Sequence, residues 1–299
     1  MSSGTTRRDA LRLLALAIGG GAIAPALARA QSADENGIPD DSNSEAMPEE
    51  PARIGRIGVQ LYTVRRLLAA NIEEVIASLA AAGITELEFA GYYDKPASWW
   101  NELMKRHNMT APATHIGLPA TNVEWLPHFE RSVAMGHKWV IVPSTSAEYR
   151  NADGWKRLAD RLNAGGELAA KSGLRMGYHN HNYEFDALPA GTNGLETLLS
   201  NTDAGLVDFE LDIYWAVKAG ADPLALLTKY PQRFTCCHVK DAGPLPTREM
   251  MDVGAGTIDF RTLLATGRKG SLQHWFIEHD DPRDALASVR ASAAALKTM

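Results

Sequence analysis

Residues 206–241 read LVDFELDIYWAVKAGADPLALLTKYPQRFTCCHVKD and contain one complete strand-helix-strand repeat. Leu206–Leu211 and Phe234–Val239 are short runs with β-branched and aromatic residues, as expected of buried strands. Between them, apolar residues recur at helical spacing in the segment 224–230. Two consecutive strands that are joined through a helix run parallel, so this stretch predicts an α/β fold with a parallel sheet.

The same alternation of strand and helix runs through residues 53–299. The predicted strands are Ile57–Tyr62, Glu86–Phe89, Thr110–His115, Trp139–Val142, Leu174–His179, Leu206–Leu211, Phe234–Val239 and Trp275–Glu278. Eight parallel strands, each followed by a helical segment, predict a single-domain (β/α)8 TIM barrel. An open doubly wound sheet is disfavoured, because no glycine-rich phosphate-binding loop follows the first strand.

Polar residues stand where these strands end, and the carboxyl ends of the strands carry the active site of a TIM barrel. They are Gln60, Tyr62, Glu88, His115, His179, His181, Asp212, His238 and Glu278. This row predicts an active site at one end of the barrel. We assign substrate binding to Gln60, Tyr62, Glu88, His115 and His179.

Three of these residues, Asp212, His238 and Glu278, follow or end adjacent strands and are difficult to bury together. Asp212 on its own is equally well read as a helix N-cap, and a histidine in an apolar strand is often a core residue. Grouped at one end of a barrel, however, they would repel one another or titrate unless a cation held them. Mixed carboxylate and imidazole ligands predict one divalent ion, Mn, Co, Mg or Zn, in an open site.

A fourth ligand is expected from the segment Tyr178–Phe185, which is dense in polar side chains. His179 and His181 share one face of the extended chain, and Glu184 lies three residues beyond. We predict that Glu184 is the ligand and that the two histidines contact substrate. The alternative that one of the two histidines is the fourth ligand stays open.

At these residues the chain resembles the xylose-isomerase-like TIM-barrel superfamily of sugar phosphate isomerases and epimerases. The matching segments are Gly58–Tyr62, Tyr178–Phe185, Glu210–Asp212, His238–Asp241, Gly254–Asp259 and Ile277–Glu278. The metal pattern of that family, Glu, Asp, His and Glu from the last four strands, implies Asp212, His238 and Glu278 as ligands. The place of the first Glu falls near His179, where this chain has no carboxylate.

The resemblance implies that the metal stabilises an enediolate formed from a sugar or keto-sugar. Glu278 is then the base, His181 its acid-base partner, and Lys240 binds a substrate oxygen unless it faces the surface. The expected activity is that of an isomerase or epimerase. The alternatives are a lyase or hydratase that cleaves 3-keto-glycosides or dehydrates keto-inositols, and a non-catalytic exported sugar-binding protein.

The N-terminus predicts export. Arg7 and Arg8 precede a modestly apolar run that ends in the small-x-small pattern Ala28-Arg29-Ala30, which indicates a twin-arginine signal peptide over residues 1–30. The run is too short and too rich in glycine for an uncleaved membrane anchor. Residues 31–52 are acidic and proline-containing, as disordered linkers are. We therefore expect a periplasmic or secreted protein, where phosphorylated sugars are scarce, and an unphosphorylated substrate.

The net charge argues against several classes of binding partner. The net charge is −6, and the first 30 residues hold four arginines and one aspartate, so the mature chain carries −9. This disfavours a nucleic-acid partner, an endonuclease activity of the same barrel type and an anionic membrane.

Cys236 and Cys237 are adjacent in a strand, so they should be buried thiols on opposite faces. The sequence leaves oligomerisation open.

Overall fold

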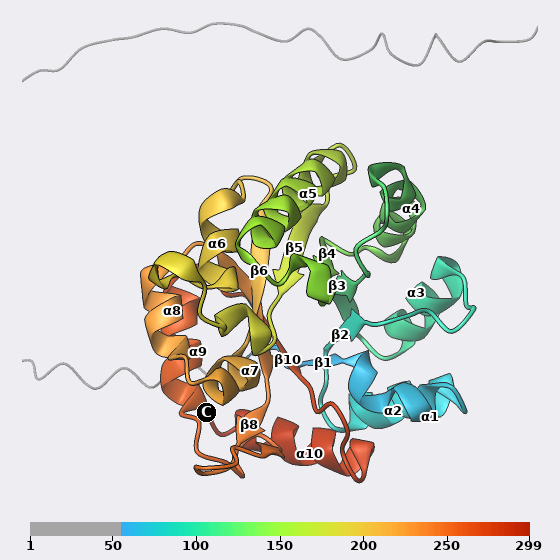
Figure 1. The fold of residues 1–299 in the computed structure, drawn as a ribbon. Coiled ribbons are helices and arrows are strands. Elements are labelled where there is room, and N and C mark those ends of the chain that lie inside the picture. The colour runs from blue at the N-terminus through green and yellow to red at the C-terminus, as the bar shows by residue number, and fades with distance from the viewer. Residues whose placement is uncertain (1–54) are drawn as a thin grey trace, which may run out of the picture. The chain divides into compact units, whose positions relative to one another are not determined.

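A computed structural model describes residues 55–299, which form a closed barrel of eight parallel strands surrounded by helices (Figure 1). The strands follow the order β1-β10-β7-β6-β5-β4-β3-β2. Their bounds are β1 Gly58–Gln60, β2 Glu86–Phe89, β3 Thr110–His115, β4 Trp139–Val142, β5 Arg175–His179, β6 Val207–Asp212, β7 Phe234–Val239 and β10 His274–Ile277. The predicted TIM barrel is therefore confirmed.

Helices connect consecutive strands and form the outer layer (Figure 1). They are α1 Arg65–Leu68, α2 Ile72–Ala81, α3 Ala97–Arg106, α4 Trp125–Met135, α5 Ala152–Ala170, α6 Gly194–Asn201, α7 Ile213–Ala219, α8 Pro223–Lys229, α9 Phe260–Lys269 and α10 Ala285–Leu296. Side-chain oxygens of Asn and Asp accept hydrogen bonds from the first turn at several of these helix starts, including Asn71, Asn151 and Asp284. Such caps fix where each helix begins and how the loop before it enters.

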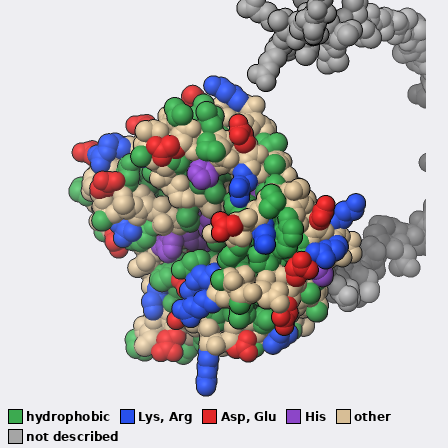
Figure 2. Space-filling model, turned by 90° about the vertical axis from the view of Figure 1, so that its right-hand side faces the viewer, with side chains coloured by type: hydrophobic (Ala, Val, Ile, Leu, Met, Phe, Trp, Pro, Cys, Tyr) green, Lys and Arg blue, Asp and Glu red, His purple; other side chains and the backbone are tan. Residues whose placement is uncertain are grey.

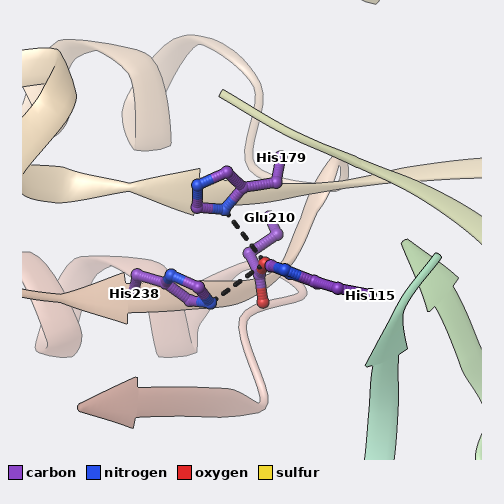
Figure 3. Close-up of side chains that lie close together, drawn as sticks. All are labelled: His115, His179, Glu210 and His238. Atoms are coloured by element: carbon purple, nitrogen blue, oxygen red, sulfur yellow. Dashed lines mark hydrogen bonds and ion pairs between the residues drawn. The ribbon is translucent and has the colours of Figure 1, made fainter. Parts of the chain in front are cut away.

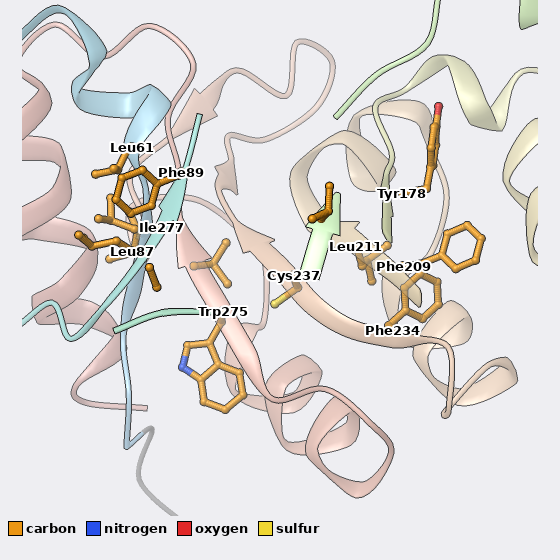
Figure 4. Close-up of a cluster of buried hydrophobic side chains, with 14 of the residues drawn as sticks. Leu61, Leu87, Phe89, Tyr178, Phe209, Leu211, Phe234, Cys237, Trp275 and Ile277 are labelled. Atoms are coloured by element: carbon orange, nitrogen blue, oxygen red, sulfur yellow. The ribbon is translucent and has the colours of Figure 1, made fainter. Parts of the chain in front are cut away.

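The alternation of side chains along each strand separates two cores. Outward residues such as Phe209, Leu211 and Cys237 pack in the large core between barrel and helices, part of which Figure 4 shows. Inward residues form a smaller cluster inside the barrel that includes Cys236 and Phe276. The two cysteines thus lie on opposite faces as free buried thiols, as their adjacency predicted.

The amino-terminal end of the barrel interior is closed by paired polar groups. His274 Nδ1 lies 2.7 Å from Glu86 Oε2, and Trp139 Nε1 donates to Asp208 Oδ2 at 2.7 Å. Arg175 Nη2 donates to the other Asp208 oxygen, also at 2.7 Å. These pairs hold polar side chains in place at the amino-terminal end of the interior.

Two predictions from the sequence concern residues outside the part of the chain that the structure describes. The predicted signal peptide, residues 1–30, and linker, residues 31–52, lie outside residues 55–299. Within residues 55–299, no helix combines the length and the apolar character that crossing a membrane requires.

Candidate active site

The carboxyl ends of the strands open into a pocket of about 430 Å³. Figure 2 shows histidine side chains within a hollow on the face that it presents. Residues expected from the sequence line the pocket, namely Tyr62, His115, His179, His181, Lys240 and Glu278. Asp280 also lines it and was not foreseen. Side chains from separate strand ends therefore meet in one place, as the barrel prediction requires.

Asp212, His238 and Glu278 converge beside this pocket. Each offers a ligand atom, and these atoms all lie within 4.8 Å of one another. His238 Nδ1 is 2.6 Å from Glu278 Oε2 and 3.8 Å from Asp212 Oδ2. All three residues are buried. The structure brings together the three groups that the sequence analysis predicted as metal ligands.

The two carboxylate oxygens of Asp212 point to different places. Oδ1 accepts a hydrogen bond from the backbone N–H of Trp215 at 2.9 Å and so caps helix α7. Oδ2 points the other way, toward His238 and Lys240. Burial raises the pKa of this carboxyl group to about 6, although the Lys240 ammonium opposes the shift. The cap fixes the carboxylate and leaves one oxygen for the site.

Lys240 is buried within the cluster and does not face the surface. Its Nζ lies 2.8 Å from Asp212 Oδ2, 2.6 Å from Glu278 Oε2 and 2.8 Å from Asp280 Oδ1. Burial alone would raise the pKa of Glu278, but the Lys240 ammonium and His238 outweigh it and hold this pKa well below its usual value. Glu278 is therefore ionised at neutral pH. Asp280 was not predicted as a site residue from the sequence, although it lies two residues after Glu278.

Glu210 joins three histidines beneath the pocket (Figure 3). Its Oε2 lies 2.7 Å from His115 Nε2, 3.0 Å from His179 Nδ1 and 3.1 Å from His238 Nε2. Because one carboxylate oxygen holds all three rings, their orientations are coupled. Glu210 was not assigned from the sequence, and the available signal was its place two residues before Asp212 on the same face of β6.

Gln60 and Glu88 lie one layer below the pocket. Gln60 Nε2 donates to Glu88 Oε2 at 2.8 Å, and that same oxygen is 2.6 Å from His238 Nε2. Neither residue is among those lining the pocket, although we predicted both as substrate-binding. Burial opposes protonation of His115, but Glu88 and Glu210 raise its pKa to about 9. A charged His115 balances part of the buried negative charge.

Tyr62 lies at the rim of the pocket with 44% of its surface exposed. The Arg65 guanidinium stacks over its ring at 3.8 Å from the centroid. Of the five residues that we assigned to substrate binding, Tyr62, His115 and His179 therefore line the pocket.

Glu184 does not join the three converging residues, contrary to the predicted ligand set. Its Oε1 accepts from the Tyr178 hydroxyl at 2.7 Å, and its Oε2 accepts from the backbone N–H of His181 at 2.8 Å. The physical reason is the turn Tyr183–Phe185 that follows β5 and folds Glu184 back into the barrel wall. Burial raises its pKa to about 7. Instead, His179 Nε2 lies 3.5 Å from Asp212 Oδ2.

His181 presents an uncommitted imidazole to the pocket. Its ring stacks on Tyr183, with centroids 5.5 Å apart and planes 8° from parallel. Nδ1 is buried and has no hydrogen-bond partner among the described residues. Burial, assisted by the Lys240 ammonium, lowers its pKa to about 4. The ring is therefore neutral at neutral pH and can accept a proton.

The glycine-rich loop at residues 254–256 is organised by a carboxylate of the protein itself. Buried Asp241 accepts hydrogen bonds from the backbone N–H groups of Gly254, Gly256 and Ile258 at 2.9, 3.0 and 3.1 Å. Gly254 has φ +86°, and a Cβ at Gly256 would lie 2.3 Å from Asp241 Oδ1. The loop needs glycine because Asp241 packs against its backbone.

Comparison with known proteins identifies the family. The profile described as xylose isomerase-like TIM barrel matches residues 51–299, so the chain belongs to that family. An inosose dehydratase of Clostridium beijerinckii is 25% identical over 255 residues, which cover 73% of this chain and 85% of that protein. A crystal structure of a sugar phosphate isomerase/epimerase from Parabacteroides distasonis is 26% identical, with a TM-score of 0.70 over 83% of this chain and 96% of that one.

A crystal structure of the IOLI protein with a bound zinc atom shares the fold. It is 15% identical, with a TM-score of 0.64, and covers 80% of this chain and 96% of that one. The inosose dehydratase and the sugar phosphate isomerase/epimerase named above are sugar-processing enzymes by name.

Proposed function

We propose that the protein is a divalent-metal-dependent isomerase or epimerase that acts through an enediolate on an unphosphorylated sugar or keto-sugar. The observation that carries this proposal is the convergence of Asp212, His238 and Glu278 beside a pocket that also holds the neutral imidazole of His181. Such a site contains a place for a cation and two separate proton acceptors, which proton transfer next to a carbonyl needs.

The residues present fit a divalent ion. Asp212 Oδ2 is buried beside Lys240 Nζ at 2.8 Å, and together with His238 and Glu278 it offers ligand atoms within 4.8 Å of one another, a donor set that divalent ions take. We propose that His179, Asp212, His238 and Glu278 hold the ion, with His179 in the place for which the sequence suggested Glu184. Two imidazoles and two carboxylates favour Mn, Co or Zn over Mg. The zinc of the related IOLI structure agrees with this choice.

When bound, the ion would act as a Lewis acid on a carbonyl and a neighbouring hydroxyl oxygen of the substrate. The protein supplies the proton transfers. Ionised Glu278 accepts the proton from the carbon next to the carbonyl, and His181 accepts or returns a proton on the other side of the pocket. Lys240 donates a hydrogen bond to a substrate oxygen. Its pKa is held well above the usual value, since Asp212, Glu278 and Asp280 outweigh the effect of burial.

The electrostatics of the pocket support an unphosphorylated substrate. Among the described residues that line it, Lys240 is the only lysine or arginine, and three carboxylates already engage it. Apart from the proposed ion, a phosphate group would meet acidic side chains and two cations, Lys240 and His115, that carboxylates already engage, which is unfavourable. The expected twin-arginine leader favours the same substrate class, and we propose that the protein is exported to the periplasm or secreted.

A lyase is the second candidate. Relatives named inosose dehydratase, 22–25% identical, favour it. It would share the first proton abstraction by Glu278. The proton that Glu278 has taken, or one that His181 has accepted, would then pass to the departing β-oxygen of a keto-inositol or a 3-keto-glycoside instead of returning to carbon.

Solvent deuterium exchange tests the proposal. The purified protein is incubated in D₂O with a panel of free sugars, 3-keto-glycosides and keto-inositols, and the products are followed by NMR. The proposal predicts deuterium at a carbon next to the carbonyl, abolished by chelator and by His238→Ala. Loss of water or of an aglycone would identify the lyase. Binding of a sugar without exchange, unaffected by chelator, would instead support the non-catalytic sugar-binding protein.

A further inference from the structure

A cation of the protein itself already contacts two of the proposed ligands. Lys240 Nζ lies 2.8 Å from Asp212 Oδ2 and 2.6 Å from Glu278 Oε2. These are oxygens that the proposed ion requires. Lys240 is only 1% exposed, so its ammonium group is held there and does not extend into solvent. A metal ion that binds at this site therefore meets this ammonium group.

The Lys240 ammonium group and a divalent ion cannot both bind these two oxygens closely. An ammonium group and a divalent ion that contact the same carboxylates would lie a few ångströms apart, and their repulsion in a buried site is large. Binding of the ion therefore requires Nζ to withdraw from at least one of the two oxygens. An ammonium group that withdraws without a new partner would be buried and unpaired, which is also unfavourable.

Asp280 is the residue that can receive it. Its Oδ1 lies 2.8 Å from Lys240 Nζ, and its side chain is 35% exposed at the pocket. Among the described residues, two groups could hold an ion, and Asp280 belongs to neither. They are His115, His179, Glu210 and His238, and Asp212, His238 and Glu278. The same ammonium group thus has two partners inside the proposed metal site and one outside it, on the substrate side.

We propose that Asp280 is a positioning residue that retains the Lys240 ammonium group when a divalent ion takes the oxygens of Asp212 and Glu278. This inference rests on the proposed function, because it assumes the ion at that site. Asp280 thereby lowers the cost of metal binding and places the charge of Lys240 at the pocket, where a substrate oxygen can meet it.

The inference makes opposite predictions for two substitutions. Asp280→Asn removes the receiving carboxylate, so metal affinity should fall by about tenfold. Lys240→Met removes the competing cation, so metal affinity should rise by about tenfold, although catalysis is lost. In the double variant, Asp280→Asn should have no further effect on metal affinity, because no ammonium group needs a partner.

The experiment is titration of the purified, chelator-treated full chain with Co²⁺ and with Zn²⁺ against a chromophoric competitor. Asp281→Asn is the matched control, since Asp281 is the next residue and carries the same charge. It pairs with Arg66 at 3.1 Å on the surface, and Lys240 forms its ion pairs within residues 55–299 with Asp212, Glu278 and Asp280 instead. The Co²⁺ absorption spectrum reports whether the ligand set stays the same in each variant.

The proposal is overturned if Asp280→Asn binds metal as Asp281→Asn does, or if Lys240→Met binds it more weakly than the wild type. Should Lys240→Met fail to fold, the comparison of Asp280→Asn with Asp281→Asn decides alone. Failure of the proposed function is distinguishable, because the wild type would then bind neither ion at this site. If the wild type binds metal and Asp280→Asn binds it equally well, only this inference is refuted.

Discussion

The two ends of the barrel interior both bury charged side chains, but they hold them differently. At the amino-terminal end, each carboxylate has its own partners: Glu86 has His274 and Arg56, and Asp208 has Trp139 and Arg175. At the carboxyl end, Glu88, Glu210, Asp212 and Glu278 share three histidines and one lysine.

Hydrogen bonding separates the two ends further. Among the described residues, the buried carboxylate oxygens without a hydrogen bond all lie at the carboxyl end. Glu88 Oε1 and Asp212 Oδ2 still have ion pairs, with His115 at 3.3 Å and Lys240 at 2.8 Å, and the third such oxygen is Glu210 Oε1. Unsatisfied buried oxygens cost free energy, which a fold does not need to spend for stability alone. The contrast indicates that the amino-terminal network closes the barrel, whereas the carboxyl-terminal cluster is arranged for a ligand.

The largest expected effect is on catalysis at the carboxyl end. Glu278→Gln removes the proposed base and one ligand charge, so turnover should fall by about a thousandfold. Initial rates on whichever substrate shows deuterium exchange measure this. A variant that retains a tenth of wild-type activity would show that the proton is taken by another group.

The next effect tests the amino-terminal end. Asp208→Asn leaves the half-buried Arg175 without its carboxylate, so the free energy of unfolding should fall by about 2 kcal/mol. Urea denaturation measures the change. Metal content and turnover should stay within about twofold of the wild type, because Asp208 closes the opposite end of the barrel. Loss of metal from this variant would erase the distinction between the two ends.

A smaller effect is expected from the residue that orients the rings. Glu210→Gln keeps the shape of the side chain but weakens its hold on His179 and His238, so metal affinity should fall by about tenfold. Competition with a chromophoric chelator reports this without reference to activity. Unchanged affinity would show that the two rings are oriented without Glu210.

The smallest effect concerns Glu184. If it supports the backbone of His181 and is not a ligand, Glu184→Gln should change metal affinity by less than about threefold. Burial raises its pKa from 4.5 to about 7, so the folded state favours the protonated form. The free energy of unfolding of the wild type should therefore fall as the pH rises from 4.5 to about 7. The variant cannot ionise at this position, so its stability relative to the wild type should increase over the same pH range. Urea denaturation at about pH 5 and about pH 8 measures this.

Much of this structure could be predicted from the sequence, because periodicity and strand-end chemistry are local. The predicted strands agree with the observed ones to within two residues at each end. The rule that barrel sites lie at strand ends located Asp212, His238 and Glu278. Contacts across the barrel could not be predicted, since His115 and Glu210 are 95 residues apart in sequence and meet only through closure.

The prediction for Glu184 depended on chain direction beyond a strand end. Spacing from His179 and His181 placed its carboxylate near the site, but the chain turns at Tyr183–Phe185 and carries it into the wall. Strand alternation no longer applies once the strand has ended, so spacing could not reveal this turn. Asp280 was missed for a related reason, because it lies in the loop after β10.

The most direct test of a metal at the carboxyl end is elemental analysis of purified wild type, Asp212→Asn and Asp208→Asn. The two substitutions make the same chemical change on the same face of β6, one at each end of the barrel. We predict about one divalent ion per chain in the wild type and in Asp208→Asn, and almost none in Asp212→Asn. A wild type without bound metal after loading, or an Asp212→Asn variant that keeps it, would contradict the account.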